Sequence, residues 1–204
     1  GVNIAGEFGG TFGDGNTLNR STGPTFPIPG YTYLNNVSAS QAVGDGNYAI
    51  VNNISPRSST NRLAKRVPNC AGATTFDNCN NRMFTGHWDI DGDHSGTSTV
   101  TGNLPPASGT TSGYMLMVNA DYVASEVYRQ TINGLCPNTD YEFSAWVRNI
   151  CPTCGMDSTG TALYNPCVLP NLTFVLHGIE RYSSGNLDIT GWQKKGFLFR
   201  TGPV

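Results

Sequence analysis

The sequence predicts an all-β protein, an antiparallel β-sandwich with long loops. No window of the 204 residues carries the apolar periodicity of an amphipathic helix. Gly (25) and Pro (12) are frequent, and Asn, Ser and Thr are abundant, a mixture that favours turns and strands. Short apolar stretches between turn residues indicate many strands. The length suits one sandwich, so residues 1–204 are expected to form a single domain.

The first half contains three short apolar stretches that predict strands. They are Val2–Phe8, Tyr31–Leu34 and Tyr48–Val51. Gly44-Asp-Gly-Asn47 before the third is typical of a tight turn. Residues 56–112 follow as a long irregular loop region, and a connection of this length is usually functional or partly disordered.

The second half is more regular and predicts five further strands. They are Gly113–Ala120, Glu126–Ile132, Tyr141–Arg148, Leu172–Leu176 and Gly196–Phe199. The third of these alternates clearly, because Tyr141, Phe143, Ala145 and Val147 share one face. Asn133-Gly134 ends the second strand as a turn signal. Strands at this spacing, with turns between them, favour an antiparallel sandwich.

Charge and cysteine content limit the partners and the compartment. Charged residues make up 13% of the chain and the net charge is -2, too little positive charge for binding nucleic acid. No apolar run is long enough to predict membrane insertion. Six cysteines, an even number, fit an oxidising compartment. We therefore expect a protein that is secreted or lies on the cell surface.

All six cysteines are expected to form disulfides. They are Cys70, Cys79, Cys136, Cys151, Cys154 and Cys167. Cys70 and Cys79 can close one loop, and Cys167 is placed to join Cys151 or Cys154. A zinc site would need a second Cys or His pair at matching spacing, and a thioredoxin motif would need a βαβ setting. A Cys136–Cys151 bridge is unfavourable because an extended strand separates the two residues.

Asp89, Asp91 and Asp93 place three carboxylates within five residues, which suggests a cation site. Calcium takes about six to eight oxygen ligands, and an acidic, Gly-containing loop supplies several at once. The spacing is not that of an EF-hand, because His94 occupies the position of the turn glycine. The alternative is a solvated acidic turn, and the residues do not decide between the two.

One long stretch resembles a known kind of module. Gly113–Ala120 followed by Val127–Val147 resembles the jelly-roll modules of large Bacteroidetes cell-surface proteins associated with gliding motility and adhesion. More distantly, it is similar to carbohydrate-binding modules of the family 4/9/22 kind. Ala5–Gly9, Asp93–Gly96 and Pro170–Phe174 fit the same pattern, so that the resemblance covers most of residues 2–199.

The resemblance implies a jelly-roll β-sandwich, export, and binding to a ligand or surface, but no ligand identity. It also implies a structural calcium near Glu7, whose alternative is an edge-strand glutamate facing water. The resembled modules continue with further strands beyond the position of Gly202. We therefore expect a piece of a larger surface protein, whose sandwich is completed by later residues, by a neighbouring chain or by residues 1–30.

Trp146 is the candidate ligand-binding residue, together with Glu142 and Arg148. The alternation places these three side chains on the face opposite the apolar set. An aromatic ring covers the apolar face of a sugar, while Glu and Arg bind hydroxyls. The alternative is that both faces of the sheet are covered and Trp146 belongs to the core.

The sequence contains no catalytic signature. It lacks a Gly-x-Ser-x-Gly elbow, a His-Glu-x-x-His helix and a Gly-rich phosphate loop. We therefore expect a non-catalytic extracellular binding or adhesion module, whose partner is a glycan or another cell-surface ligand and which holds calcium. The alternative is a self-assembling structural subunit of a filament or surface layer, completed by strand exchange between copies of itself.

Overall fold

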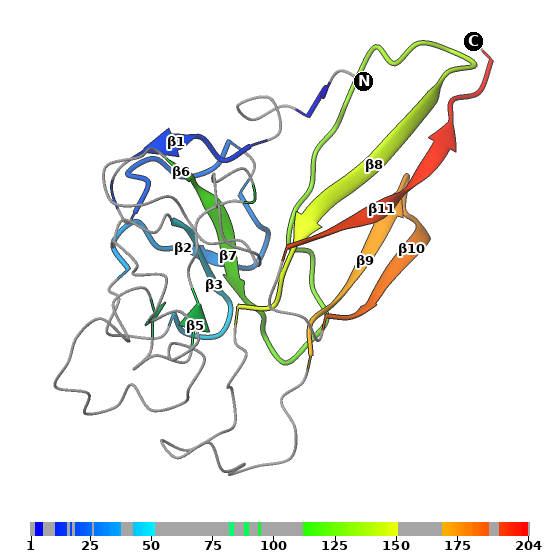
Figure 1. The fold of residues 1–204 in the computed structure, drawn as a ribbon. Coiled ribbons are helices and arrows are strands. Elements are labelled where there is room, and N and C mark those ends of the chain that lie inside the picture. The colour runs from blue at the N-terminus through cyan, green and yellow to red at the C-terminus, as the bar shows by residue number, and fades with distance from the viewer. Residues whose placement is uncertain are drawn as a thin grey trace, which may run out of the picture.

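The structure is a computed structural model that describes residues 3–5, 11–15, 17, 19–25, 27–37, 43–51, 82–83, 88–89, 94, 112–150, 169–187 and 192–203. The described residues form strands and turns but no helix, in agreement with the predicted all-β class (Figure 1). Consequently, no helix in this part of the chain is long and apolar enough to cross a membrane.

The strands pair into small sheets of two or three strands. Their bounds are β1 (Asp14–Gly15), β2 (Thr32–Tyr33), β3 (Asn47–Val51), β4 (Arg82–Met83), β5 (Trp88–Asp89), β6 (Ser112–Gly113), β7 (Met115–Asn119), β8 (Asp140–Val147), β9 (Asn171–Leu176), β10 (Ile179–Asn186) and β11 (Gln193–Arg200). The pairs are β1–β6, β4–β5, β8–β11 and β9–β10, and β2–β3–β7 is the three-stranded sheet.

The sheet β2–β3–β7 contains the main core. β3 pairs antiparallel with β7 from Asn47↔Asn119 to Val51↔Met115. Successive side chains of β3 point to opposite faces, yet all four from Tyr48 to Val51 are buried, so both faces of this strand are covered. The buried cluster on one face consists of Val37, Val43, Ala49, Val51, Met115 and Met117. The predicted strands around Tyr31–Leu34, Tyr48–Val51 and Gly113–Ala120 are therefore confirmed as β2, β3 and β6–β7.

Two polar side chains fix the loops that cover this sheet. The buried guanidinium of Arg20 donates to the carbonyl oxygens of Phe12 (2.7 Å), Thr22 (2.9 Å) and Gly23 (2.9 Å). The Asn19 amide donates to the Val37 carbonyl and accepts from the Val37 N–H, at 3.0 and 2.9 Å. These bonds satisfy backbone groups that no strand partner reaches.

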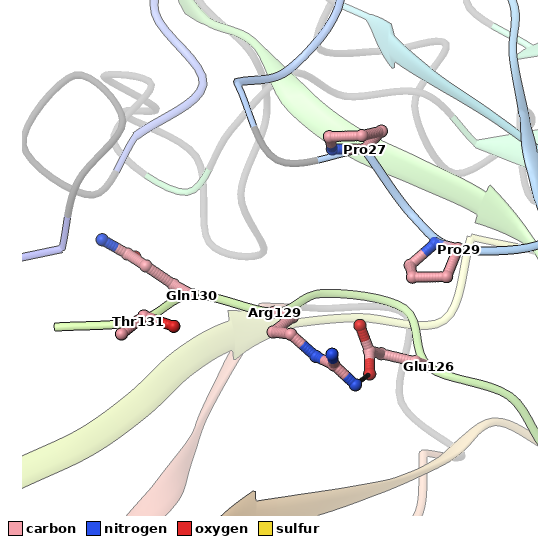
Figure 2. Close-up of a pocket in the computed structure, with 6 residues that line it drawn as sticks. All are labelled: Pro27, Pro29, Glu126, Arg129, Gln130 and Thr131. Atoms are coloured by element: carbon pink, nitrogen blue, oxygen red, sulfur yellow. Dashed lines mark hydrogen bonds and ion pairs between the residues drawn. The ribbon is translucent and has the colours of Figure 1, made fainter.

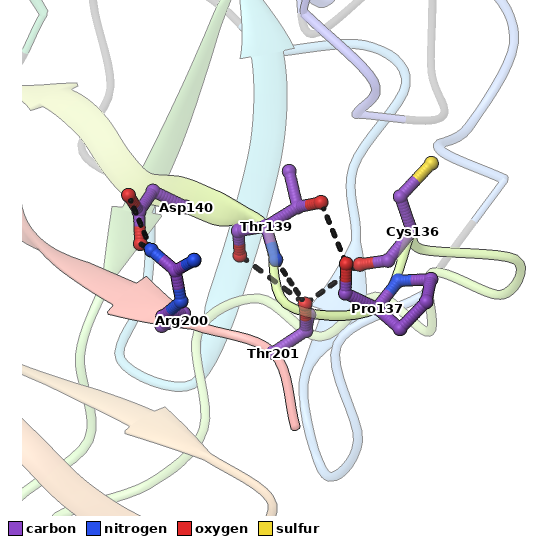
Figure 3. A network of polar contacts seen from close by, with 6 residues as sticks. All are labelled: Cys136, Pro137, Thr139, Asp140, Arg200 and Thr201. Atoms are coloured by element: carbon purple, nitrogen blue, oxygen red, sulfur yellow. Dashed lines mark hydrogen bonds and ion pairs between the residues drawn. The ribbon is translucent and has the colours of Figure 1, made fainter. Parts of the chain in front are cut away.

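β8 and β11 form a long two-stranded ribbon. Their register runs without interruption from Gln193↔Val147 to Arg200↔Asp140. Beyond the strands, the Thr201 hydroxyl donates to the Cys136 carbonyl at 2.6 Å and accepts from the Thr139 N–H at 2.9 Å (Figure 3). Arg200 Nη1 lies 3.1 Å from both carboxylate oxygens of Asp140. This end of the ribbon is therefore held by side chains as well as by the strand ladder.

The β9–β10 hairpin packs against the β8–β11 ribbon through aromatic rings. Phe143 contacts Phe174 edge-on, with ring centroids 5.3 Å apart, and contacts Phe197 at 5.7 Å. Phe174 in turn contacts Tyr182 at 5.6 Å. Rings from all four strands therefore meet, and the strands β8 to β11 gather on one side of the molecule (Figure 1).

Two of the predicted strands are not present in the described residues. Residues 126–132 are described but form no strand, because they have no strand partner. Residues 3–5, the described part of the predicted Val2–Phe8 strand, are also not in a strand. Conversely, β10 was not predicted. It forms because His177 and Gly178, with φ angles of 52° and 77°, make a two-residue hairpin turn after β9.

Candidate ligand-binding face of the β8–β11 ribbon

One face of the ribbon carries the predicted site residues Glu142 and Trp146. The inner face of β8 carries Tyr141 and Phe143, which take part in the ring contacts with β9–β11. Since side chains alternate along a strand, Glu142 and Trp146 point to the outer face. Lys194 lies directly opposite Trp146 on β11 and shares that face. The ring contacts of Tyr141 and Phe143 agree with the predicted apolar face of β8, although Ala145 on the same face is exposed.

Glu142 and Lys194 form an ion pair on this face. Lys194 Nζ lies 2.6 Å from Glu142 Oε1, and both side chains are nearly half exposed. The hydrogen bond from Lys194, aided by one from Ser144, lowers the pKa of Glu142 below its ordinary value of 4.5. The ionised carboxylate therefore favours the folded state above that value, and the contribution is lost as the pH falls through the lowered pKa.

Trp146 presents a partly open ring. The residue is 43% exposed. The His94 ring is stacked on it, with centroids 4.6 Å apart and planes inclined by 15°. One face of the indole is therefore covered by His94, while the rest of the side chain contributes to the surface next to Lys194.

Arg148 occupies a different place from the one predicted. β8 ends at Val147, so Arg148 no longer follows the strand alternation. Its guanidinium carbon lies 5.7 Å from the centre of the Trp192 ring, a cation–π contact. Gln193 pairs with Val147, and this register brings the preceding residue, Trp192, to the end of β8. Arg148 therefore borders the site through Trp192 and does not stand beside Glu142.

Trp192 and His94 complete the cluster. Their rings meet edge-on with centroids 6.3 Å apart, and Trp192 also packs against the main core. The sequence shows Trp192 and His94 only as isolated residues outside the predicted strands. Their proximity to Trp146 depends on the β8–β11 register and on the placement of His94, neither of which has a local sequence signal.

Most of the predicted metal ligands lie outside the described residues. Glu7, Asp91 and Asp93 are among them, and Asp89 is described only as a residue of β5 paired with Arg82. Within the described ranges, no three His, Cys, Asp or Glu residues are grouped as metal ligands would be. The calcium site therefore stays a prediction.

The cysteines are described at one position only. Cys136 is exposed and carries a free thiol, which departs from the expectation that it forms a disulfide. Its backbone is instead held by Tyr141, whose hydroxyl accepts from the Cys136 N–H at 2.8 Å, and by the Thr201 hydroxyl. The pairing of Cys70, Cys79, Cys151, Cys154 and Cys167 lies outside the described residues and stays a prediction.

The outer face combines three kinds of recognition group. The indole of Trp146 offers an apolar surface, the Glu142 carboxylate accepts hydrogen bonds, and the Lys194 ammonium donates them. Groups of this kind bind ligands that have both an apolar face and hydroxyls. No known protein family, curated protein or solved structure matches this chain.

Proposed function

We propose that this protein is a non-catalytic extracellular binding module, secreted or displayed on a cell surface, which recognises glycans. Its strands belong to a jelly-roll sandwich in this proposal, and the outer face of β8–β11 is the binding face. The resemblance of residues 113–147 to surface adhesin modules supports this proposal, and the all-β class is consistent with it.

The observation that carries the proposal is the half-open indole of Trp146 beside the Glu142–Lys194 ion pair. A sugar ring placed against the indole would lie next to Lys194, which is opposite Trp146 on β11 and holds the Glu142 carboxylate. Exposed aromatic residues on a strand are otherwise unfavourable, since they leave apolar area in water. A ligand that covers the ring removes this cost.

Substitution of Trp146 tests the binding face. We expect Trp146→Ala to weaken glycan binding by about 1 kcal/mol or more, roughly fivefold in the dissociation constant, while the melting temperature changes little. Binding is screened on a glycan array and then measured by calorimetry. Tyr122→Ala is the matched control, because Tyr122 is an exposed aromatic residue after β7 that does not belong to β8 or β11.

Two results would contradict this assignment. Loss of the fold in Trp146→Ala would make the ring part of the core, and equal weakening by Tyr122→Ala would show that the effect is not specific to the outer face.

A structural calcium forms part of the proposal, with either Glu7 or some of Asp89, Asp91 and Asp93 as its ligands. Calcium that binds only the folded state stabilises it by about 2.7 kcal/mol at a hundredfold excess over the dissociation constant. We therefore expect added calcium to raise the melting temperature and a chelator to lower it. A melting temperature that responds to neither would remove calcium from the proposal.

A second candidate function is that of a structural subunit that assembles with copies of itself. It is favoured by one observation: among the described residues, β8 and β11 pair only with each other. Each strand therefore has a second edge without a strand partner, and strand addition from another chain uses such an edge.

A further inference from the structure

A pocket of about 160 Å³ lies between two segments that are distant in sequence. Pro27 and Pro29 form one side, and Glu126, Arg129, Gln130 and Thr131 form the other (Figure 2). The sequence pattern predicted a strand at residues 126–132, but in the structure four of these residues line a pocket.

Tyr31 holds the two segments of the pocket together. Its hydroxyl lies 2.6 Å from Ser125 Oγ and accepts from the Asp121 N–H at 3.1 Å. Because Tyr31 follows Pro29 closely and Ser125 precedes Glu126, these bonds fix both sides of the pocket. The pocket is therefore part of the folded arrangement around β7.

Glu126 has one satisfied and one unsatisfied carboxylate oxygen. Oε2 accepts from Arg129 Nη2 at 2.5 Å, whereas Oε1 is buried and has no hydrogen-bond partner among the residues that the structure describes. Figure 2 shows the second oxygen pointing away from Arg129, toward Pro29. A buried acceptor without a donor is unfavourable. The terminal torsion of a glutamate is soft, so a small rotation presents this oxygen to a ligand donor.

The size of the pocket matches a single six-membered ring. An apolar cavity of about 150 Å³ accommodates benzene, whereas sites for drug-sized ligands start at about 300 Å³. The pocket therefore suits one unit of a larger ligand. The two proline rings supply an apolar wall against which the C–H groups of such a ring can pack.

The charges of the pocket favour a neutral ligand. The carboxylate of Glu126 and the guanidinium of Arg129 neutralise each other, so that a cation would meet Arg129 and an anion would meet Glu126. Gln130 and Thr131 each donate and accept hydrogen bonds. A neutral ring with several hydroxyls satisfies all four side chains, because each hydroxyl both donates and accepts.

From these contacts we propose that the pocket binds one neutral pyranose unit, with a hydroxyl that donates to Glu126 and accepts from Arg129. The ligand class rests on the proposed glycan-binding function, but the site does not involve Trp146.

Free monosaccharides are the probe for this site. We expect a panel of neutral methyl hexopyranosides to give saturation-transfer NMR signals with the protein. For the sugar that binds, Glu126→Gln should raise the dissociation constant roughly tenfold or more, because a neutral amide replaces the charged acceptor of the hydrogen bond. Glu180→Gln is the matched control, since Glu180 is an exposed glutamate on β10. If Glu126→Gln fails to fold, Thr131→Val takes its place as the test of the pocket, because it removes only a single hydroxyl at an exposed position.

The outcomes separate the pocket from the β8–β11 face. In a Trp146→Ala background, which removes sugar bound at the β8–β11 face, Glu126→Gln should still weaken the remaining monosaccharide binding. The pocket proposal is overturned if no hexopyranoside binds, if Glu126→Gln binds as well as the wild type, or if butylammonium binds in place of the sugars. None of these results decides the function proposed for Trp146, which is tested separately by the glycan binding of Trp146→Ala.

Discussion

At Gly196, in the middle of β11, the structure leaves no room for a side chain. An added Cβ would lie 2.1 Å from the Phe143 carbonyl oxygen and 2.5 Å from Ser144 Cα. The φ angle of Gly196 is +155°, a conformation that residues with a side chain rarely adopt. Both obstacles come from the backbone, so rotation of a flexible side chain cannot remove them.

We expect Gly196→Ala to destabilise the protein by about 2 kcal/mol or more, because the strands must move apart to admit the methyl group. Lys194 is two residues away, so the same shift should weaken its ion pair with Glu142. Denaturant unfolding measures the free-energy change. Gly202→Ala is the control, since nothing lies within 4 Å of a Cβ there. Equal stability of the two variants would show that the close approach at Gly196 is not maintained.

The sequence predicted some site residues and missed others, for a physical reason. The face of the sheet on which Glu142 and Trp146 lie follows from the two-residue period of a strand, which is a local property. Arg148 was assigned by extending the period one residue past the end of β8. The grouping of His94 and Trp192 with Trp146 was not predicted, because their contact requires a strand register and a loop position that no local pattern encodes.

The same distinction applies to whole strands. β8, β9 and β11 were predicted, because their apolar residues alternate or cluster between turn signals. β10 escaped prediction, because Ile179–Asn186 is largely polar and becomes a strand by pairing back onto β9. Glu126–Ile132 has the composition of a strand but pairs with no strand among the described residues. Pairing with another strand, and not composition, therefore decides whether these two segments form strands.

The packing of the β9–β10 hairpin on the ribbon depends on Phe174. This ring is 6% exposed and contacts both Phe143 and Tyr182. We expect Phe174→Ala to cost about 3 kcal/mol, because it removes a buried aromatic ring and leaves a cavity. Val175→Ala is the matched control: Val175 is the next residue of β9, faces the other side and is 48% exposed.

Unfolding curves and near-UV circular dichroism of the two variants provide the measurement. A loss in Phe174→Ala no greater than that in Val175→Ala would show that the aromatic contacts between the ribbon and the hairpin contribute little to stability.

For the molecule as a whole, the sheet β2–β3–β7 and the β8–β11 ribbon differ in how completely they are covered. β3 is buried on both faces, whereas in the described part of the chain β8 and β11 pair only with each other, which leaves the outer edge of each strand unpaired. The Thr201 N–H bonds to the Thr139 carbonyl, so in this antiparallel ladder every second pair from Phe199↔Tyr141 onward is also hydrogen-bonded. The backbone N–H and C=O groups of Leu198, and those of Gly196 and Arg200 two residues to either side, therefore point away from β8.

This outward edge carries an exposed apolar residue, Leu198, which is 77% exposed. An edge strand with unpaired backbone groups and an exposed leucine favours pairing with another chain. We therefore expect the protein to associate as its concentration rises, which sedimentation velocity measures directly. Leu198→Lys should reduce association, because a charge on an edge strand opposes pairing. Tyr122→Lys, at an exposed position after β7 that belongs to no strand, should not. A wild-type protein that stays monomeric at every concentration, or equal effects of the two lysines, would exclude the β11 edge as an assembly surface.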